Sequence, residues 1–488
     1  MKKLIIAIVI VVICVAGWAG ATYIVGGQVE SRYSALLDQY GQYGGWQWSS
    51  QSYERGFLTS RARTVLELPM PKAAEQNQDV PQEPLRLTFE HILHHGPLPA
   101  GNTPDGKFSM TPILAWVETR LVDVSPSDES LDETVKKLPQ LRESYAFTVV
   151  GLDGGGASRL MIPAFEQTLK QDDGEFTFSW DGLTVNSQFS KDMEAISGEC
   201  SLPRIQVRMK DGGMAWDGIH ANFDLTQAFP MVYVGDFAMH LGGMQMNFQD
   251  PQGNNEREVS MKGLDFTSQS VREGSTVRYD QAIKLAAFTV GDETYGPGLM
   301  EVTTSNLDGE AVSRFQSDIQ QMSQSGAIYT PEDITARLLP VYIQFLTDLA
   351  KSSPEIDFRR VQFATPRGNL DGSVRVKLHG EDGVVFNDPQ SWAKNLEAAA
   401  QLTIDEGLVR SMMASDLEKD FKLAREQGNL PDFSDEEIGN LIQQQIDGQI
   451  EAMAAQNLLL RENGQLKSQA TFNRGELVVN ERALPLFQ

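Results

Sequence analysis

The sequence predicts an α+β protein with an N-terminal transmembrane helix, a long antiparallel β-meander sheet, and a C-terminal region of amphipathic helices interleaved with β-hairpins. Three observations support this prediction. An uncharged, mostly apolar run extends from Leu4 to Val25, period-two alternation dominates to about Val302, and helical periodicity follows after about Ser305. We therefore expect a signal-anchor helix at 1–26, a β-rich domain at 27–305 and an α+β region at 306–488.

The N-terminal run is expected to anchor the chain in a membrane. It is long enough to cross a bilayer core of about 30 Å, and Lys2 and Lys3 place the N-terminus in the cytoplasm by the positive-inside rule. Ala19-Gly20-Ala21 would pass as a cleavage site, but apolar character continues past it, which favours a retained anchor over a cleaved signal. Residues chosen to represent this anchor are Leu4, Ile13, Trp18 and Val25.

Composition narrows the possible partners. The chain carries 41 Lys+Arg against 66 Asp+Glu, a formal net charge of −25. Because such a surface repels phosphate backbones, we expect no nucleic-acid partner. Cys14 lies in the apolar run and Cys200 in the exported part, so the two cannot pair. The exported part must then be stabilised by its core rather than by disulfides.

Alternating patterns predict the β-meander. Arg204 to Lys210, Gly242 to Phe248 and Glu175 to Trp180 alternate between polar and apolar residues, which is typical of antiparallel strands with one buried face. Asp-Gly pairs suit type I′ hairpin turns, and they occur at Asp153-Gly154, Asp173-Gly174, Asp181-Gly182, Asp211-Gly212 and Asp217-Gly218. Residues 69–84, 97–106 and 123–140 are expected to be insertions between strands.

Helical periodicity predicts four helices in the C-terminal region. The first carries the stripe Val312, Phe315, Ile319 and Met322. The second starts at Thr330-Pro331 and ends at Ser353-Pro354, and Pro340 should kink or divide it. The third opens at Asp388-Pro389 and runs through Trp392, Leu396 and Ala399. The fourth opens with a capping box at Ser434-Asp435-Glu436-Glu437.

Hairpins are predicted after two of these helices. Ile356 to Phe363 and Ser373 to Leu378 flank a Thr-Pro-Arg-Gly-Asn turn, and Gln465 to Phe472 and Glu476 to Asn480 flank Asn473-Arg474-Gly475. A helix–strand–turn–strand unit therefore occurs near 331–378 and again near 435–480, which indicates an internal repeat.

Three histidines form the first candidate site, in His91-Ile92-Leu93-His94-His95. On a helix, His91 and His95 would share a face, as metal ligands often do. The preceding alternation favours a strand, on which the two lie about 13 Å apart, too far to hold one ion alone. We therefore predict no metal site and no cofactor.

The sequence gives little support for a catalytic thiol or a nucleotide-binding loop. Cys200 with His220 or His240 would be needed for a thiol–imidazole pair, but their spacing does not support one, and a lone Cys is usually a small core residue. Gly154-Gly155-Gly156 is better explained by a turn than by a nucleotide-binding loop. No residue set argues for an enzyme.

Two tryptophans follow the anchor, in Gly44-Gly45-Trp46-Gln47-Trp48. They suit either an interfacial aromatic belt or a first strand with both indoles in the core, and we favour the core. The segment from Ser31 to Tyr40 would then form a short juxtamembrane helix.

Several motifs resemble, in their order, those of the YdgA-like family of Gram-negative envelope proteins, a family of unknown function. The resemblance spans nearly the whole chain. The motifs are the N-terminal anchor, Ser52-Tyr53-Glu54-Arg55-Gly56-Phe57-Leu58-Thr59-Ser60-Arg61-Ala62, His95-Gly96-Pro97-Leu98, Phe363-Ala364-Thr365-Pro366-Arg367-Gly368 and Gly475-Glu476-Leu477-Val478-Val479-Asn480.

The resemblance implies an inner-membrane protein with a cytoplasmic N-terminus and a periplasmic bulk, capable of self-association, with no catalytic residues to transfer. Where the family usually has an Asn-Gly turn, this chain has Asn480-Glu481, so a tight turn is less expected there. The layout is also similar in architecture to AsmA-like proteins, which are thought to move lipids along a β-groove, although fold does not imply function.

We weigh three functions. The first, which the sequence favours, is a non-enzymatic envelope protein that binds itself, as a homo-oligomer, or binds other envelope proteins. The second is a lipid-binding protein with an apolar groove, and the third is a hydrolase with an unrecognised site. Candidate groove-lining residues come from two Met- and Phe-rich strands, although we favour ordinary core for these strands; the candidates are Met231, Tyr233, Met239, Met244, Met246 and Phe248.

Overall fold

The computed structural model describes residues 2–43, 46–68, 84–96, 113–125, 142–171, 174–210, 212–249, 256–324, 331–380, 383, 388–427 and 433–484. Contacts group the chain into two units, Met1–Gln227 with Gln316–Ile334, and Ala228–Phe315 with Thr335–Gln488. The predicted insertions lie outside the described residues, apart from residue 84 and residues 123–125, which end a strand. We describe each unit by itself.

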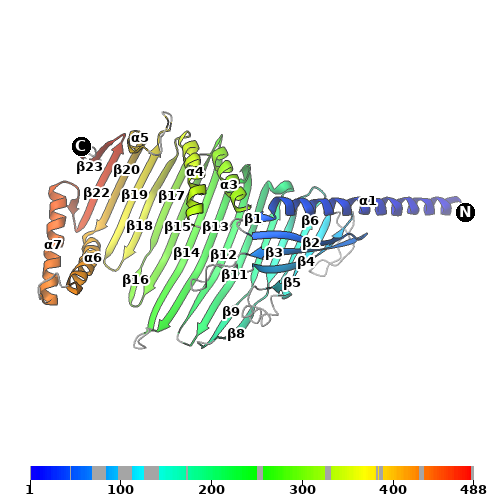
Figure 1. The fold of residues 1–488 in the computed structure, drawn as a ribbon, viewed down its shortest axis with the longest axis horizontal. Coiled ribbons are helices and arrows are strands. Elements are labelled where there is room, and N and C mark those ends of the chain that lie inside the picture. The colour runs from blue at the N-terminus through cyan, green and yellow to red at the C-terminus, as the bar shows by residue number, and fades with distance from the viewer. Residues whose placement is uncertain are drawn as a thin grey trace. The chain divides into compact units, whose positions relative to one another are not determined.

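The first unit is an antiparallel sheet built almost in chain order (Figure 1). Each strand pairs with the next from β1 to β7, β7 pairs with β10, and β11 pairs with β10 and β9 on one side and with β12 on the other. Strand β8 pairs with β9. The strands are β1 (Gln42–Tyr43), β2 (Trp46–Glu54), β3 (Thr59–Leu68), β4 (Leu85–His95), β5 (Ala115–Ser125), β6 (Tyr145–Val150), β7 (Gly156–Ile162), β8 (Phe165–Gln171), β9 (Gly174–Trp180), β10 (Leu183–Phe189), β11 (Ala195–Met209) and β12 (Gly212–Phe229).

One helix, α1 (Lys2–Tyr40), packs on this sheet. Thr22, Gly26 and Val29 recur at helical spacing and are buried, and Val29 packs with Ala62, Leu93, Leu114 and Ala115 in a core cluster. The small residues let α1 approach closely, because a Cβ on Gly26 would lie 2.7 Å from His95 Cε1. The face of α1 that meets the sheet is therefore defined by side-chain size as much as by hydrophobicity.

Aromatic and charged contacts fix α1 further. Trp18 meets Phe57 edge to face at 6.2 Å between ring centroids. The Arg55 guanidinium lies 4.4 Å from the centroid of the Tyr23 ring and 3.6 Å from a Glu30 carboxylate oxygen, and it donates to the Tyr23 carbonyl. Part of the predicted anchor thus contacts the folded sheet.

Two predictions about α1 change accordingly. The predicted juxtamembrane helix from Ser31 to Tyr40 is not a separate element, because α1 continues through it without a break. Over the residues that the structure describes, no helix combines the length and the apolar character that a bilayer crossing requires. The side chains of residues 1–15, which include Leu4 and Ile13, lie outside that description, so the transmembrane assignment stays a prediction.

The second unit is also an antiparallel meander (Figure 1). Strand β14 pairs with β13 and β15, β15 pairs with β16 and β17, and pairing continues through β18, β19, β20 and β22, which also pairs with β21 and β23. Strand β24 follows β23. The strands are β13 (Val232–Gln249), β14 (Glu256–Glu273), β15 (Thr276–Val290), β16 (Glu293–Tyr295), β17 (Gly298–Asp308), β18 (Glu355–Thr365), β19 (Gly368–Leu378), β20 (Leu396–Asp405), β21 (Leu460–Glu462), β22 (Gln465–Asn473), β23 (Glu476–Val479) and β24 (Arg482–Leu484).

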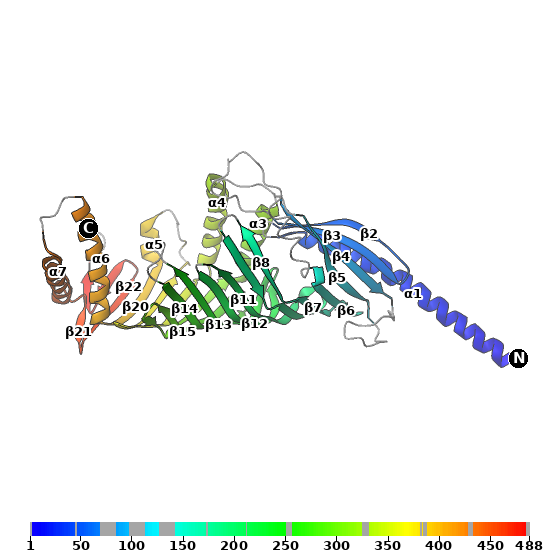
Figure 2. The same ribbon diagram turned by 90° about the horizontal axis from the view of Figure 1, so that it is seen from below.

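Helices interrupt this meander. Within the second unit, α4, α5 and α6 stand on the same side of the sheet (Figure 2). The predicted capping box of α7 is confirmed, since the Glu437 amide donates to Ser434 Oγ and the Ser434 amide donates to the Glu437 carboxylate. The helices are α3 (Gly309–Gln324), α4 (Pro331–Ala350), which includes Pro340 without being divided, α5 (Pro389–Asn395), α6 (Glu406–Glu426) and α7 (Asp435–Ala455).

Two of the turns predicted from Asp-Gly pairs are not hairpin turns in the structure. Asp217-Gly218 is not a turn but lies inside β12, where Gly218 takes φ +63° opposite Pro203, which has no amide hydrogen to give the ladder. Asp181-Gly182 joins β9 to β10, which do not pair with each other, so it makes no hairpin. Asp153-Gly154 does lie in the β6–β7 connection.

Two helices near the C-terminus, α5 and α6, also differ from the prediction. The predicted helix through Leu396 and Ala399 ends at Asn395, and both residues belong to β20. Helix α6 was not predicted. Asn480 and Glu481 both take positive φ, +44° and +69°, so the turn is tight despite the missing glycine. Trp48 is half-buried against Phe89 and Trp46 is 53% exposed, so the prediction that both indoles lie in the core is wrong for Trp46.

We predict that Gly26→Ala destabilises the docking of α1, whereas Gly20→Ala does not. Both changes gain roughly 1 kcal/mol of helix propensity, but only the first places a methyl group against His95, at an overpacking cost of about 1–3 kcal/mol. Nothing lies within 4 Å of a Cβ at Gly20. Thermal unfolding of the full chain, followed by near-UV circular dichroism, measures the difference. Equal midpoints for the two variants would contradict the packing.

Candidate functional site

Apolar side chains form rows across the sheet of the second unit. Residues directly opposite each other in an antiparallel ladder point to the same face. Two adjacent rows cross β13, β14, β15, β17 and β18. The first row is Met239, Phe266, Ile283, Met300 and Val361, and the second is Leu241, Leu264, Leu285, Gly298 and Phe363.

These rows lie on the face that carries the helices. The second row continues through Leu370, Ile404 and Leu466, which pack against α6 and α7 in one core cluster. At the other end of the face, Val277 is buried against Val312 of α3. It lies six residues before Ile283 on a stretch of β15 that pairs with β14 without interruption, so both side chains point to the same face. The two rows therefore lie on the face of the sheet that α6 and α7 cover at one end and α3 covers at the other.

The apolar alternation changes phase partway along three neighbouring strands. Before the change the apolar positions are Leu241, Leu264 and Leu285; after it they are Met244, Met261 and Phe288, which again pair across the strands. The ladders skip residues 242, 263 and 286 at this point, and Gly263 takes φ +58°. In a regular strand, residues three apart such as Leu241 and Met244 point to opposite faces, so we infer that the irregularity returns the apolar side chains to one face.

Tyr295 confirms that placement. It pairs with Phe288 at the end of the third row, and it lines the same pocket as Leu408 of α6, which stands on the helix-bearing face. We call the three rows together the apolar face.

The middle of the apolar face is only partly covered. Phe266, Ile283 and Met300 are half-buried and belong to none of the three core clusters found among the described residues. The opposite face is polar and solvated: His240 Nδ1 lies 2.7 Å from Asp265 Oδ1, and both side chains are about half exposed. An antiparallel sheet normally keeps its apolar face out of water, and within the part of the chain that the structure describes this region is only half-buried.

The six predicted groove residues fall in different places. Met239, Met244 and Met246 take part in apolar cross-strand pairs, with Phe266, Met261 and Val259. Met231 lies in the turn before β13 at φ +63°, and Tyr233 is half-buried near the start of that strand. Phe248 is 42% exposed and pairs with Arg257 near the other end. Met239, Met244 and Met246 therefore lie in apolar rows across the strands, whereas Met231, Tyr233 and Phe248 lie near the two ends of β13.

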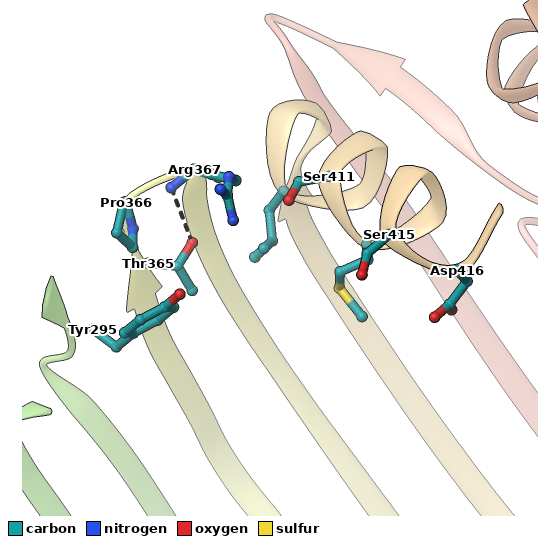
Figure 3. A pocket seen from close by; sticks show the side chains of 9 residues that line it. Tyr295, Thr365, Pro366, Arg367, Ser411, Ser415 and Asp416 are labelled. Atoms are coloured by element: carbon teal, nitrogen blue, oxygen red, sulfur yellow. Dashed lines mark hydrogen bonds between the residues drawn. The ribbon is translucent and has the colours of Figure 1, made fainter. Parts of the chain in front are cut away.

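A pocket of about 300 Å³ adjoins the apolar face (Figure 3). One wall is the turn between β18 and β19, and the other is the first part of α6. Its lining combines hydroxyl, charged and apolar groups, from Tyr295, Thr365, Pro366, Arg367, Leu408, Ser411, Met412, Ser415 and Asp416.

Glycines and one aspartate bring these walls together. A Cβ on Gly368 would lie 2.6 Å from Asp405 Cβ, and one on Gly407 would lie 2.9 Å from the Arg367 carbonyl oxygen. The Asp405 carboxylate accepts from the backbone and side chain of Asn369 and from Gln465, and these hydrogen bonds lower its pKa. The predicted Thr-Pro-Arg-Gly-Asn turn is thus fastened to the start of α6.

Charge in the pocket is nearly balanced. Arg367 Nη2 lies 3.1 Å from a Glu293 oxygen, and Tyr295 donates to the other oxygen at 2.5 Å. The hydrogen bond to Glu293 raises the pKa of Tyr295, so its hydroxyl stays protonated at neutral pH. Behind the pocket, burial alone would raise the pKa of Glu406, but its hydrogen bonds with Arg410 and Arg461 lower it. The pocket could hold a polar group without a large net charge.

The histidine cluster lies on β4, as predicted from the alternation. His91 hydrogen-bonds Thr64 and Thr119 through its two ring nitrogens, at 2.6 and 2.8 Å, and His94 stacks on Trp116 at 3.7 Å. Within the described residues, no group of three or more His, Cys, Asp or Glu side chains could hold a metal ion. The histidines are held by hydroxyl and aromatic neighbours instead.

Burial determines the charge of this cluster. It lowers the pKa of His91 to about 4, with Glu90 opposing the shift. Burial also lowers the pKa of His95, helped by the positive charges of Arg55 and His94. His95 is fully buried against α1, with Nε2 2.9 Å from Ser60 Oγ and Nδ1 without a described partner. Burial raises the pKa of Cys200, which does not favour a reactive thiolate.

Comparison with known proteins places these features in a family. A family profile described as "Bacterial protein of unknown function (DUF945)" matches residues 1–487. The chain is also similar to the protein YdgA of Escherichia coli strain K12, with 18% identity over 508 residues, covering 100% of this chain and 95% of that protein. The expected resemblance is confirmed at the level of the family.

We predict that His91 makes the stability of the protein fall at acidic pH. Its pKa is about 4 in the folded state and about 6.5 in the unfolded state. The neutral His91 ring therefore makes its full contribution to the free energy of unfolding above about pH 6.5. As the pH falls to about 4, the free energy of unfolding decreases by up to roughly 3 kcal/mol. His91→Gln should flatten this dependence in urea titrations, while His220→Gln, at an exposed position, should not. Identical pH profiles for the two variants would refute the assignment.

Proposed function

Because the chain belongs to the family described as bacterial protein of unknown function (DUF945), we propose a function from its geometry: it is a non-enzymatic protein that binds the acyl chain of a lipid on the apolar face of its second unit. The observation that supports this most is the shared change of phase at residues 242, 263 and 286. It supports the placement of apolar side chains on one face both before and after these residues, while none of the core clusters in the described part of the chain includes the middle of that face.

The size of the apolar face suits an acyl chain. Its half-buried part crosses five strands, β13, β14, β15, β17 and β18, which are four spacings of about 4.8 Å, or about 19 Å. The hydrocarbon layer of one bilayer leaflet is about 15 Å thick, half of the 30 Å core. Methionines at 239, 244, 261 and 300 lie among the rows, and Met side chains adapt to ligands of varied shape.

The pocket suits the polar end of such a lipid. Tyr295 belongs both to an apolar row and to the pocket lining, so it joins the two surfaces. Beyond it, the pocket offers a guanidinium on Arg367 and a carboxylate on Asp416, with hydroxyls between them. Arg367 already pairs with Glu293 and Asp416 with Lys419, so a zwitterionic headgroup would join an existing ion pair at each of its charges.

Membrane anchoring is part of the same proposal. The charged start at Lys2 and Lys3 and the apolar run that follows support insertion of the N-terminal part of α1 into the inner membrane, with both units on the periplasmic side. The first contact of α1 among the described side chains is that of Trp18 with Phe57 in the β2–β3 connection, so we place the inserted part before that residue. This arrangement would place both units in a compartment that borders the lipid of the inner membrane.

Self-association is the alternative favoured by a separate observation. Leu339, Tyr342 and Leu346 lie along α4 at helical spacing and are 54%, 49% and 37% exposed. A second copy of the chain, or another envelope protein, would bury such a stripe. A hydrolase has less support, because neither Ser411 nor Ser415 hydrogen-bonds a histidine or a carboxylate among the described residues.

Native mass spectrometry of the detergent-purified full chain tests the proposal. We expect co-purified lipid on the wild-type protein. Ile283→Glu places a charge on the apolar face and should reduce the bound fraction by roughly tenfold, equivalent to about 1.4 kcal/mol. The matched control is Lys284→Glu, which changes the adjacent, exposed position on the opposite face and should leave the bound fraction unchanged.

Two results would overturn lipid binding. One is a lipid-free wild-type monomer after extraction in mild detergent. The other is a lipid-free dimer that Leu346→Glu converts to a monomer, which would assign the exposed helix stripe to self-association instead. Circular dichroism of each variant confirms that the fold is retained.

A further inference from the structure

A second hollow, of about 430 Å³, lies in the first unit on strands β6, β7, β10, β11 and β12. It is a groove between two rows of side chains. One row is Phe147, Arg159, Asn186, Glu199 and Asn222, and the other is Val149, Ala157, Gln188 and Ser197. We call it the polar groove.

The floor of the polar groove is backbone. Ser158, Ser187 and Gly198 line it and occupy the row between the two walls, so by alternation their side chains point to the other face of the sheet. Small residues at Ala157 and Ser197 in one wall leave room above this floor. The groove runs across the strands for four spacings of about 4.8 Å, or about 19 Å.

Several wall groups have hydrogen-bonding capacity to spare. The side chains of Arg159, Gln188 and Asn222 make no hydrogen bond or ion pair with the described residues, whereas the Asn186 side chain donates to a Glu199 oxygen at 3.0 Å. Amide and guanidinium groups are planar and can each donate in pairs. Together they provide donors and acceptors on both sides of one channel.

Charge and aromatic character define the kind of ligand. Arg159 and Glu199 balance each other within the walls, while the whole chain carries −25, so an anionic ligand would meet net repulsion. At the β6 end, Phe147 lies in the wall and its ring is 5.4 Å from that of buried Trp116, which stacks on His94. An aromatic platform beside planar polar groups suits the apolar C–H face and the hydroxyls of a sugar ring.

A peptide strand fits less well. Strands β7, β10 and β11 are paired on both sides, so their backbone groups are already used in the sheet. No free edge lies in the groove to which a peptide could add as a further strand. Recognition must therefore come from the side chains of the walls.

From these observations we propose that the polar groove binds a neutral oligosaccharide. Phe147 supports one sugar ring, and Gln188, Asn222 and Arg159 bind hydroxyl or acetamido groups of the units that follow. The proposal concerns a different surface from the acyl-chain site and stands independently of it.

Isothermal titration calorimetry on the full chain provides the test, with cellotetraose, maltotetraose and tetra-N-acetylchitotetraose as probes. We expect at least one of them to bind with a stoichiometry of one. Gln188→Ala and Asn222→Ala should each raise the dissociation constant by roughly five- to tenfold, the usual effect of losing one hydrogen-bonding side chain. Gln167→Ala, on β8 outside the groove, is the matched amide control and should bind like the wild type.

Because Gln188 and Asn222 are exposed, both variants should keep the wild-type melting temperature, which separates lost binding from lost folding. The absence of binding by all three probes would overturn the proposal. Binding that the two groove variants retain at wild-type strength would also overturn it, as would displacement of the sugar by an uncharged tetrapeptide.

Discussion

The structure depends on one constraint: each strand of an antiparallel sheet has two faces, and the apolar one must be covered. In the first unit the cover over β3 to β5 is α1, which approaches through Thr22, Gly26 and Val29. In the second unit, α6 and α7 cover the last strands, and α3 covers the corner around Val277. The strands between these helices obey the same alternation but have only partial cover, and this difference creates the candidate site.

Backbone irregularities preserve that two-faced character over strands of up to 18 residues. The skipped pairs at 242, 263 and 286 shift the phase of three strands together, with Gly263 in a conformation that disfavours other residues. Pro203 opposite Gly218 plays a comparable part in the first unit. Each irregularity involves facing residues of neighbouring strands, so pairing on either side stays in register.

Much of the fold could be predicted because its signals are local. Alternation identified the strands and placed His91 and His95 on β4, and the capping box at Ser434 marked the start of α7. Helix α6 was missed because it begins directly after β20 without a side-chain cap, and the Asp405 carboxylate that would mark its start is bound to Asn369 and Gln465 instead. The pocket depends on this helix and on Gly368 and Gly407, so sequence patterns alone could not assemble it.

The single unbroken course of α1 has a mechanical consequence. From Trp18 to Tyr40 the helix spans about 33 Å at 1.5 Å per residue, and it is held by the Arg55 contacts near one end and the Tyr33–Tyr53 ring contact further along. A helix that contacts the sheet at two separated places moves with the sheet as one rigid element. Any tilt or rotation imposed on its N-terminal half is transmitted to β2–β4, so the orientation of the first unit follows that of the helix.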